Sequence, residues 1–335
     1  MVLKLKKIAI FAHYDKHNIV DPYVIHYLEQ LQQIADVVFV SDCDLPHAEI
    51  KKVMPYSIEV LAKRHGMYDF GSYKLGYLTI ENKIQDYDEL ILCNDSVYGP
   101  LSPLAQLWQK MSSDEVDFWG VSENYFYNNS KIKNTPQFID SYHLQSFFLV
   151  FKKNIFSSIL FKKFIHSIKE EDGKQDIISN YEIGLSQMLI KNGFRPKSLT
   201  KFNMQKFHNG YVQGVLCDDW VEYINLGMPF VKVYLLRNNP RKIMGINNNF
   251  SRIYDENRLM ILNHLSRVNP TYRESWCVFK RNKTYNIFDF SIVSKGVFIF
   301  FCIRCSGILI FAAPVSLNFI KLMYMAIRYK KIVVG

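Results

Sequence analysis

The sequence predicts an α/β fold in which a Rossmann-type, mostly parallel sheet carries helices on both faces, with a helical extension at the C-terminal end. Two features of the first 130 residues predict it. Short apolar runs alternate with segments whose apolar residues recur at helical spacing. The runs are apolar throughout, as expected of strands in a parallel sheet that is covered on both faces. The composition, with 49% hydrophobic and 21% charged residues, is that of a globular protein and excludes wholesale disorder, collagen and a coiled-coil rod.

Each element is expected where its pattern begins and ends. Strands are expected at residues 8–12, 36–41, 88–93, 117–122, 146–152 and 229–236. Helices are expected at residues 24–34, 58–64, 72–83, 104–111, 155–168, 180–191 and 256–267. The helix over 180–191 has a stop signal, Asn192-Gly193, directly after it, and Ser72 is a candidate N-cap.

Two regions are expected: a first domain over residues 1–243, and a helical, apolar and basic region over residues 244–335 that docks either to the membrane or to a partner protein. The run over residues 296–320 is long enough to cross a bilayer, but Arg304 and Pro314 interrupt it. An arginine at mid-membrane costs about 2.5–3.5 kcal/mol on insertion scales. Three interpretations of this run stay open: a segment lying on the membrane surface, a buried helical hairpin, and a true span. The basic residues 328–331 would meet anionic headgroups.

The charge balance indicates an anionic partner. Lysine and arginine number 41 against 31 aspartate and glutamate residues, which gives a formal charge of +10. Nucleotide phosphates and an anionic membrane surface both fit, whereas the sequence has no motif of a nucleic-acid-binding module, so nucleic acid is not expected as a partner. It also has no G-x-G-x-x-G fingerprint, which argues against an NAD enzyme. Six scattered cysteines and an N-terminal apolar run too short for a signal peptide predict a cytoplasmic protein.

The first candidate functional residues follow the expected strands, because ligands bind beyond the carboxyl ends of strands in such sheets. Asp95, between Asn94 and Ser96, is placed to hold a ribose hydroxyl or a metal on a diphosphate. The alternative is an Asx-turn that only ends the strand. The tripeptide at residues 13–15, His-Tyr-Asp, follows the first strand, where a nucleotide would approach the sheet.

Further candidates lie at helix starts and in loops. Lys74 and the amides near Ser72 either receive a phosphate at a helix N-terminus or belong to a capped turn. Glu182 is either a general base for a hydroxyl nucleophile or a first-turn glutamate favoured by the helix dipole. His143 is placed to bind an acceptor, although a lone histidine is more often a structural hydrogen-bonding residue, and His208 is similarly ambiguous.

Seven segments carry a resemblance to a known family: FAHYD (11–15), YDFGSYKLG (68–76), YDELILCNDSVYGPLSPL (87–104), DFWGVS (117–122), HLQSFFLVFKK (143–153), YEIGLSQ (181–187) and PFVKVYLLRNNP (229–240). Over about residues 7–243 the chain resembles the rhamnan synthesis protein F family, which comprises bacterial glycosyltransferases of polysaccharide and O-antigen assembly. The specificity comes from many motifs in one order, above all NDSVYGP and HLQSFFLVF.

The resemblance implies a GT-A-like fold and an enzyme that uses a nucleoside-diphosphate sugar as donor. The sugar would pass to a growing, often lipid-linked glycan at the cytoplasmic face of the inner membrane. Rhamnose from dTDP-rhamnose is the named association, and galactofuranose or another hexose is the alternative. Partner glycosyltransferases of the assembly machinery are implied as well.

The resemblance also implies roles for the candidate residues. Asp95 takes the place of a DxD carboxylate, but Asn-Asp-Ser departs from that pattern and leaves dependence on Mn²⁺ or Mg²⁺ open. Glu182 matches the acidic residue that supplies the base in inverting enzymes. The donor-binding residues would be His13, Tyr14, Asp15, Lys74, Asn94, Ser96 and Tyr98. The acceptor-binding residues would be His143 and Gln145, and His208 would either ligate the metal or, with Lys74, replace it.

Two other classes of function stay open. A non-catalytic carbohydrate-binding or scaffold subunit would keep the fold without an intact acidic centre, whereas Asp95 and Glu182 are both present here. A nucleotidyl- or phosphotransferase is also compatible with carboxylates at strand ends.

Overall fold

The structure, a computed structural model, describes residues 5–113, 115–125, 141–201, 220–251, 253, 255–277, 303–305 and 308–310. The chain divides into two compact units, residues 1–278 and 279–335. The first unit continues past residue 243, where the sequence predicts a domain boundary. It does so because later residues, among them Ile246, Phe250, Ile261 and Leu265, are buried in the same core as the sheet.

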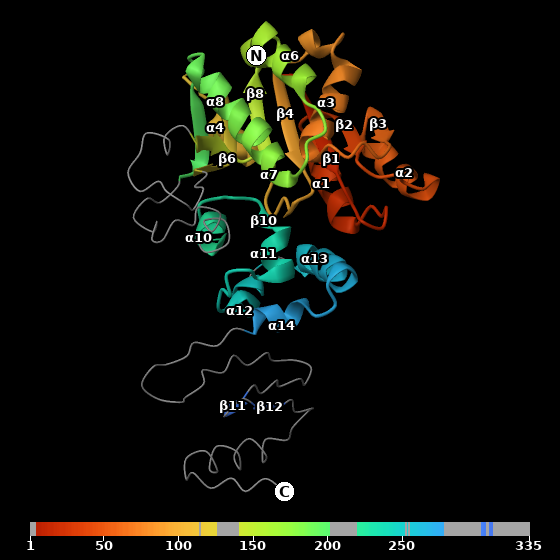
Figure 1. Ribbon diagram of the computed structural model, residues 1–335, viewed down its shortest axis with the longest axis vertical. Coiled ribbons are helices and arrows are strands. Elements are labelled where there is room, and N and C mark those ends of the chain that lie inside the picture. The colour runs from red at the N-terminus through yellow and green to blue at the C-terminus, as the bar shows by residue number, and fades with distance from the viewer. Residues whose placement is uncertain are drawn as a thin grey trace, which may run out of the picture. The chain divides into compact units, whose positions relative to one another are not determined.

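An eight-stranded sheet forms the framework of the first unit (Figure 1). Its strands are β1 (Lys7–His13), β2 (Asp36–Ser41), β3 (Glu59–Ala62), β4 (Glu89–Asn94), β6 (Phe118–Tyr125), β7 (Tyr142–Leu144), β8 (Phe148–Lys152) and β9 (Pro196–Thr200). They lie in the order β3-β2-β1-β4-β8-β6-β7, with β9 beside β6. The pairings β1–β2, β1–β4, β2–β3 and β6–β9 are parallel, whereas β8 is antiparallel to both β4 and β6, and β7 is antiparallel to β6. The sheet is therefore mostly parallel, as predicted.

Helices cover both faces of this sheet, as predicted (Figure 1). One cluster of buried side chains joins the sheet to α1 (Pro22–Gln32), α4 (Ala105–Met111), α10 (Trp220–Asn225), α11 (Val233–Asn238), α12 (Ile246–Phe250), α13 (Asp255–Val268) and α14 (Tyr272–Trp276). The other joins it to α3 (Tyr68–Ile80), α5 (Lys153–Phe156), α6 (Ile159–Ser167), α7 (Lys174–Ile177) and α8 (Gly184–Lys191). Along β1, Ala9 and Phe11 belong to the first cluster, while Ile8 and Ile10 belong to the second. This alternation is the period of a β-strand with both faces buried.

The described part of the first unit also contains short elements: α2 (His47–Val53), η1 (Met54–Tyr56), η2 (Ile84–Asp86), β5 (Val97–Tyr98), the π-helical turn η4 (Ile178–Ile183) and β10 (Val231–Lys232). β10 pairs antiparallel with β5. α3 approaches β1 so closely that a Cβ added at Gly76 would lie 2.4 Å from Cγ2 of Ile10. Glycine at this position lets the helix lie directly against the strand.

Most expected elements are confirmed, but three expectations are wrong. The helix predicted over residues 58–64 is instead strand β3, because residues 59–62 pair in parallel with β2 and this pairing overrides local preference. The strand predicted over residues 229–236 is limited to β10, because its partner β5 has two residues and the chain then continues as α11. Ser72 does not cap a helix, because α3 already begins at Tyr68 and Ser72 lies buried inside it.

In the second unit the structure describes two short strands, β11 (Ile303–Cys305) and β12 (Ile308–Ile310), which pair antiparallel. They belong to the apolar run over residues 296–320, whose other residues lie outside the described part of the chain, as do residues 328–331. The three interpretations of this run therefore stay predictions. Among the helices that the structure describes, none has the length and apolar character needed to cross a membrane.

Candidate active site

The site lies where the order of the strands reverses. From β1 the chain passes through α1 to β2 on one side, whereas β4, which follows α3, pairs with β1 on the other side. In open α/β sheets ligands bind beyond the carboxyl ends of the strands at such a switch point. Residues 13–15 and 94–96 meet at this edge, where the N–H of Asp95 donates to the carbonyl of Ala12 at 3.2 Å.

Asp95 is the central carboxyl group of this edge. Its Oδ2 accepts a hydrogen bond from the backbone N–H of Tyr14 at 2.9 Å and lies 3.8 Å from Nε2 of His13. Burial raises the pKa of Asp95 well above its usual value; the Tyr14 bond opposes this shift, and the carboxyl groups of Asp69 and Asp15 add to it. The side chain keeps 11% of its surface exposed. The carboxyl group of Asp95 is therefore partly accessible and lies near other acidic groups. Binding of a cation or a proton to this carboxyl group would be favourable.

His13 presents a neutral imidazole to Asp95. Its ring is buried, and Nδ1 lies 2.9 Å from Oγ of Ser41 at the end of β2. Burial lowers the pKa of His13 to about 4, although the carboxylates of Asp15 and Glu49 raise it. Because the ring is uncharged at neutral pH, its Nε2 can form a hydrogen bond or ligate a metal.

Asn94 and Ser96, on either side of Asp95, connect the end of β4 to two other elements. Nδ2 of Asn94 donates to Oδ2 of Asp69 at 2.8 Å, and Oδ1 of Asn94 accepts from Oγ of Ser96 at 2.7 Å. Oγ of Ser96 in turn accepts from Nζ of Lys232 at 3.2 Å. Asp69 is in the first turn of α3 and Lys232 is in β10, so one hydrogen-bond chain joins α3, β4 and β10.

Asp69 lies among charges of both signs. Burial raises the pKa of Asp69 to about 6, the ammonium groups of Lys232 and Lys174 lower it, and the carboxylate of Glu182 raises it. Both lysines and Glu182 are thus close enough to Asp69 to change its ionisation. The carboxyl group of Asp69 is therefore bonded to the end of β4 and lies within electrostatic range of Glu182.

Glu182 lies in η4, the π-helical turn between α7 and α8. Its Oε1 accepts two hydrogen bonds from Ser146, one from the backbone N–H at 2.8 Å and one from Oγ at 3.0 Å. The next residue, Phe147, accepts a backbone hydrogen bond from Asn94 at 3.3 Å. Glu182 is therefore held against the segment that adjoins the end of β4. Single π-helical turns inside helices are frequent at functional sites.

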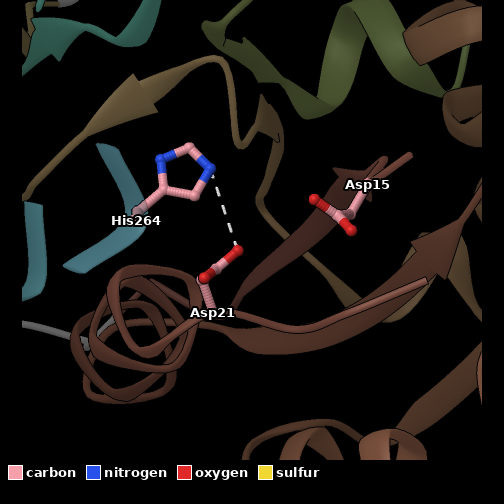
Figure 2. Close-up of side chains that lie close together, drawn as sticks. All are labelled: Asp15, Asp21 and His264. Atoms are coloured by element: carbon pink, nitrogen blue, oxygen red, sulfur yellow. Dashed lines mark ion pairs between the residues drawn. The ribbon is translucent and has the colours of Figure 1, made fainter. Parts of the chain in front are cut away.

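A second acidic group, which contains Asp15, is already neutralised by an arginine. Asp15, Asp21 and His264 offer ligand atoms within 4.8 Å of one another (Figure 2). Nη2 of Arg267, on α13, lies 2.6 Å from Oδ2 of Asp15 and also bonds Oδ2 of Asp21. Burial alone would raise the pKa of Asp15, but the bonds from Arg267 and from the amides of the following loop lower it. Because the guanidinium fills the place of a cation between the two carboxylates, these residues do not fit a metal ion.

Tyr98 lies in the same buried network rather than beside Asp95 itself. Its hydroxyl is 2.6 Å from Nδ1 of His264, and its ring packs edge-on against Tyr23. The hydroxyl of Tyr23 donates to the backbone carbonyl of Asp95 at 3.1 Å. Burial lowers the pKa of His264 to about 4, although the carboxylate of Asp21 raises it. The network therefore supports the backbone at Asp95 through α1 and α13.

Lys74, predicted to contact the donor, faces α6. Its Nζ donates to the backbone carbonyls of His166 at 3.0 Å and Ile168 at 2.6 Å, at the C-terminal end of that helix. The structure therefore does not bring Lys74 together with Asp95. His208, predicted as a metal ligand or its replacement, lies outside the described residues.

The two predicted acceptor-binding residues lie in and after β7, next to Ser146. His143 is buried, with Nδ1 2.8 Å from the carbonyl of Ser141. Gln145 donates its backbone N–H to the carbonyl of Ser122 at 2.8 Å. Ser146 holds Glu182, so Gln145 directly precedes the residue that binds the candidate base, and His143 lies three residues before it.

Three residues of this edge, Asp69, Lys232 and Arg267, are absent from the site that the sequence predicts. Asp69 stands in the YDFGSYKLG segment, so its signal was available in a carboxylate beside the start of a helix. Lys232 and Arg267 have no such local signal, because only the pairing of β10 with β5 and the packing of α13 bring them to this edge.

The fold and the site together define an α/β protein with a carboxyl-rich ligand edge at the switch point of its sheet. The model of the family described as rhamnan synthesis protein F matches residues 37–294. The chain belongs to this family, as its motifs predict.

Two curated relatives are similar at the level of sequence. The uncharacterized protein y4gN of Sinorhizobium fredii is 26% identical over 191 residues, a match that covers 57% of this chain and 48% of that protein. The chain thus spans about half the length of this relative. The virulence protein VirA of Vibrio anguillarum is 26% identical over 270 residues, with 70% of this chain and 81% of that protein covered.

Solved structures of glycosyltransferases are similar over part of the chain. Core-mannan synthase A from Aspergillus fumigatus, in its Mn/GDP form, has a TM-score of 0.32 and 9% identity over 61% of this chain and 80% of that one. A glycosyltransferase involved in the glycosylation of the major capsid of PBCV-1 has a TM-score of 0.31 and 10% identity over 67% of this chain and 92% of that one.

Proposed function

We propose that this chain is a glycosyltransferase that moves a sugar from a nucleoside-diphosphate donor to a growing bacterial surface polysaccharide. Rhamnose is the sugar that we expect, since the family is described by rhamnan synthesis. A lipid-linked acceptor at the cytoplasmic face of the inner membrane, and partner glycosyltransferases that act on the same glycan, belong to the proposal. The charge of +10 suits both a diphosphate and an anionic membrane surface.

The observation that carries the proposal is the position of Asp95. Its carboxyl group lies at the switch point between β1 and β4, where ligands approach sheets of this kind. It stands 3.8 Å from the neutral imidazole of His13 and keeps 11% of its surface exposed. A carboxyl group whose pKa is raised well above its usual value at such a position is typical of a functional site.

In this proposal the donor lies across the ends of β1 and β4. Tyr14 has a side chain that is 52% exposed, and its ring suits stacking on a nucleotide base. Polar contacts to the donor come from His13, Asn94 and Ser96. Asp15 and Tyr98, also expected in the donor site, act through their contacts with Arg267 and His264, which keep the loop after β1 in place.

Transfer breaks the bond between C1 of the sugar and the diphosphate oxygen, and the electron pair leaves with the nucleoside diphosphate. An acceptor hydroxyl forms the new bond to C1, and its proton passes to the carboxylate of Glu182. The two hydrogen bonds from Ser146 to Oε1 keep this carboxylate oriented. His143 and Gln145 are the acceptor-binding residues of the proposal.

A divalent cation fits the Asp95 side of this edge. The carboxyl group of Asp95 and Nε2 of His13 offer an oxygen and an imidazole nitrogen 3.8 Å apart, a donor set that suits Mn²⁺ better than Mg²⁺. When bound, such an ion would supply positive charge to the diphosphate. Asp95 and His13 are the residues that would hold it.

The test is release of nucleoside diphosphate by the purified full chain, followed by mass spectrometry. The donor panel holds dTDP-rhamnose, UDP-galactofuranose, UDP-galactose, UDP-glucose and GDP-mannose, each with a synthetic lipid-linked acceptor, in Mn²⁺ and in EDTA. We expect turnover of dTDP-rhamnose by the wild type and none by Asp95→Ala. Turnover of another donor would support the glycosyltransferase activity and show that the transferred sugar is not rhamnose. No turnover of any donor, with no thermal stabilisation by any donor, would favour a non-catalytic scaffold subunit.

A further inference from the structure

The carboxyl group of Asp69 uses one of its two oxygens within the protein. Oδ2 accepts a hydrogen bond from Nδ2 of Asn94 at 2.8 Å. Oδ1 has no hydrogen-bond partner among the described residues, and solvent reaches it because the side chain is only partly buried. The two oxygens of a carboxylate offer about four acceptor sites. Oδ1 of Asp69 can therefore accept a hydrogen bond from a ligand without breaking the bond to Asn94.

Asp69 lies on a face of α3 that contacts both sides of the proposed site. Residues four positions apart on a helix share one face, and Tyr73 lies four residues after Asp69. The hydroxyl of Tyr73 donates to the backbone carbonyl of Ser146 at 2.8 Å, and Ser146 holds Glu182. This face of α3 is thus bonded to the end of β4 through Asp69 and to the residue that holds the proposed base through Tyr73.

This location is the one that the transferred sugar requires. At the moment of transfer, C1 of the sugar has the leaving diphosphate on one side and the attacking hydroxyl on the other. The proposed function places the diphosphate at Asp95 and the hydroxyl at Glu182. Asp69 is bonded to the residue directly before Asp95, and Glu182 is close enough to raise the pKa of Asp69. The carboxyl group of Asp69 is therefore near both groups that flank the sugar.

The charge of Asp69 selects a hydroxyl group rather than a phosphate as the ligand. Burial raises the pKa of Asp69 to about 6, the ammonium groups of Lys232 and Lys174 lower it, and the carboxylate of Glu182 raises it. Since this pKa lies below 7, the ionised form predominates at neutral pH. An ionised acceptor forms stronger hydrogen bonds than a neutral one. A carboxylate thus attracts a hydroxyl group, whereas it repels the negative charge of a diphosphate.

We propose that Asp69 binds the sugar of the donor, with Oδ1 accepting a hydrogen bond from one sugar hydroxyl while Oδ2 keeps the bond from Asn94. The inference rests on the proposed function and adds the residue that recognises the transferred sugar. Asp69 contributes to the binding of the nucleotide sugar and not to the binding of the nucleoside diphosphate alone. A site that is built to bond a hydroxyl group also rejects an analogue that lacks this group.

The experiment compares Asp69→Asn with the wild type. The amide oxygen of asparagine can accept the bond from Asn94, so the contact with β4 can persist while the acceptor for the sugar is lost. The matched control is Asp86→Asn, at an exposed aspartate of η2, which precedes β4 and so lies away from the carboxyl end of that strand. Thermal melting checks the fold. Asp69→Asn should melt no lower than the wild type, because burial makes the ionised form of Asp69 unfavourable.

Calorimetry without acceptor measures binding of dTDP, UDP and GDP and of the nucleotide sugars in the panel above. The free diphosphates keep the base, the ribose and both phosphates, and lack only the sugar. A second set of donors carries fluorine in place of one sugar hydroxyl at a time, because fluorine cannot donate a hydrogen bond. Turnover of the same donors is measured with the lipid-linked acceptor.

We expect Asp69→Asn to weaken binding of the preferred nucleotide sugar by about tenfold or more, as loss of a hydrogen bond to a charged group predicts. Binding of the free diphosphate should change by less than about twofold. The wild type should bind one fluorinated donor about tenfold more weakly than its parent. The variant should bind this donor and its parent alike, because the two changes remove the same contact. Asp86→Asn should match the wild type throughout.

Each other outcome decides a separate claim. If the wild type transfers sugar and Asp69→Asn equals it in binding the nucleotide sugar, the inference is wrong and the proposed function stands. If Asp69→Asn loses diphosphate and nucleotide-sugar binding alike, or if every fluorinated donor binds the wild type as its parent does, Asp69 does not recognise the sugar. If Asp69→Asn loses only nucleotide-sugar binding but the wild type transfers no sugar, the inference holds and the transferase reaction fails. If the wild type binds no nucleotide sugar, both are overturned.

Discussion

Arg267 and Asp15 form a short ion pair, with Nη2 and Oδ2 2.6 Å apart, although 252 residues separate them in the sequence. The same guanidinium bonds Asp21, the residue directly before α1. The carboxylate of Asp21 makes no capping bond to the start of α1 and is directed to the arginine instead. The loop after β1, whose first residue donates its N–H to Asp95, is thus tied to α13. The geometry at Asp95 therefore depends on a helix beyond residue 243.

Removal of this arginine should destabilise the fold. Arg267→Met leaves two mostly buried carboxylates without their partner, and breaking a buried ion pair in this way costs about 3–5 kcal/mol. Chemical denaturation at pH 7.5 should show a loss of this size in the free energy of unfolding. The triple variant Arg267→Met with Asp15→Asn and Asp21→Asn serves as control and should regain part of the loss. A single variant within about 0.5 kcal/mol of the wild type would show that the pair contributes nothing.

The two buried histidines should make stability fall in mild acid. Burial lowers the pKa of both His13 and His264 to about 4. A histidine whose folded pKa is depressed contributes its full stability above its unfolded pKa of about 6.5 and loses it as the pH falls toward the folded pKa. At pH 5 each buried histidine should lower the free energy of unfolding by about 2 kcal/mol. Long-range ¹H–¹⁵N spectra should show both rings neutral at pH 5.

Asp69 titrates over part of the same range with the opposite sign. Since its pKa is raised to about 6, it destabilises the fold above that pH, and the cost is relieved as the pH falls. We therefore compare the pH dependence of the free energy of unfolding between the wild type and His264→Gln. Asp69 is present in both proteins, so its contribution cancels in this comparison. The variant should lose about 2 kcal/mol less than the wild type between pH 7.5 and pH 5. Equal losses in the two proteins would contradict burial of a neutral His264.

Asp95→Asn should separate stability from activity. Because burial and nearby carboxyl groups raise the pKa of Asp95, its ionised form is unfavourable in the folded state at neutral pH. Asparagine has nearly the same shape and no charge, so the variant should melt higher than the wild type in EDTA at pH 7.5. It should nevertheless lose donor turnover, since stabilising changes at functional positions commonly cost activity. A variant that melts lower and keeps turnover would contradict both the electrostatic description and the role of Asp95.

The fold could largely be predicted from the sequence because its main signals are local. The segments that form β1, β2, β4 and β8 are continuous apolar runs in the sequence, and the apolar spacing over residues 256–267 predicts the helix α13. β3 could not be predicted, because its residues 59–62 are ordered by pairing with β2 rather than by their own pattern. The length of β10 could not be predicted for the same reason, because only its pairing with β5 limits this strand to two residues.

The candidate site could be predicted only where it follows the strands. His13 and Asp95 could be predicted because both come at the ends of apolar runs, at the edge where parallel strands end. Lys232 and Arg267 could not be predicted, because each contacts a residue that is far away in the sequence. Lys232 lies 136 residues after its partner Ser96, and Arg267 lies 252 residues after its partner Asp15. Lys74 is an example of a residue that the sequence places in the site and the structure does not. Its position near a helix start predicted a phosphate contact, but its side chain donates to the carbonyls at the end of α6.

Glu182→Gln should stop transfer while leaving the donor bound. Ser146 donates two hydrogen bonds to Oε1, and the amide oxygen of glutamine can accept both, so the local structure should persist. An amide cannot take up the proton of the acceptor hydroxyl, and loss of a general base lowers kcat by about 10²–10⁴. Calorimetry should give diphosphate binding within about twofold of the wild type, and the donor panel should show the drop in kcat.

The matched control for this substitution is Glu171→Gln. Oε1 of Glu171 accepts a hydrogen bond from the hydroxyl of Tyr181, the residue directly before Glu182, and a glutamine can accept that bond as well. The control should therefore keep both binding and kcat at the wild-type level, because it removes a carboxylate next to the same turn without touching the proposed base. A Glu182→Gln enzyme with wild-type kcat would exclude Glu182 as the base, and parallel losses of binding and kcat would make it a structural residue of the donor site.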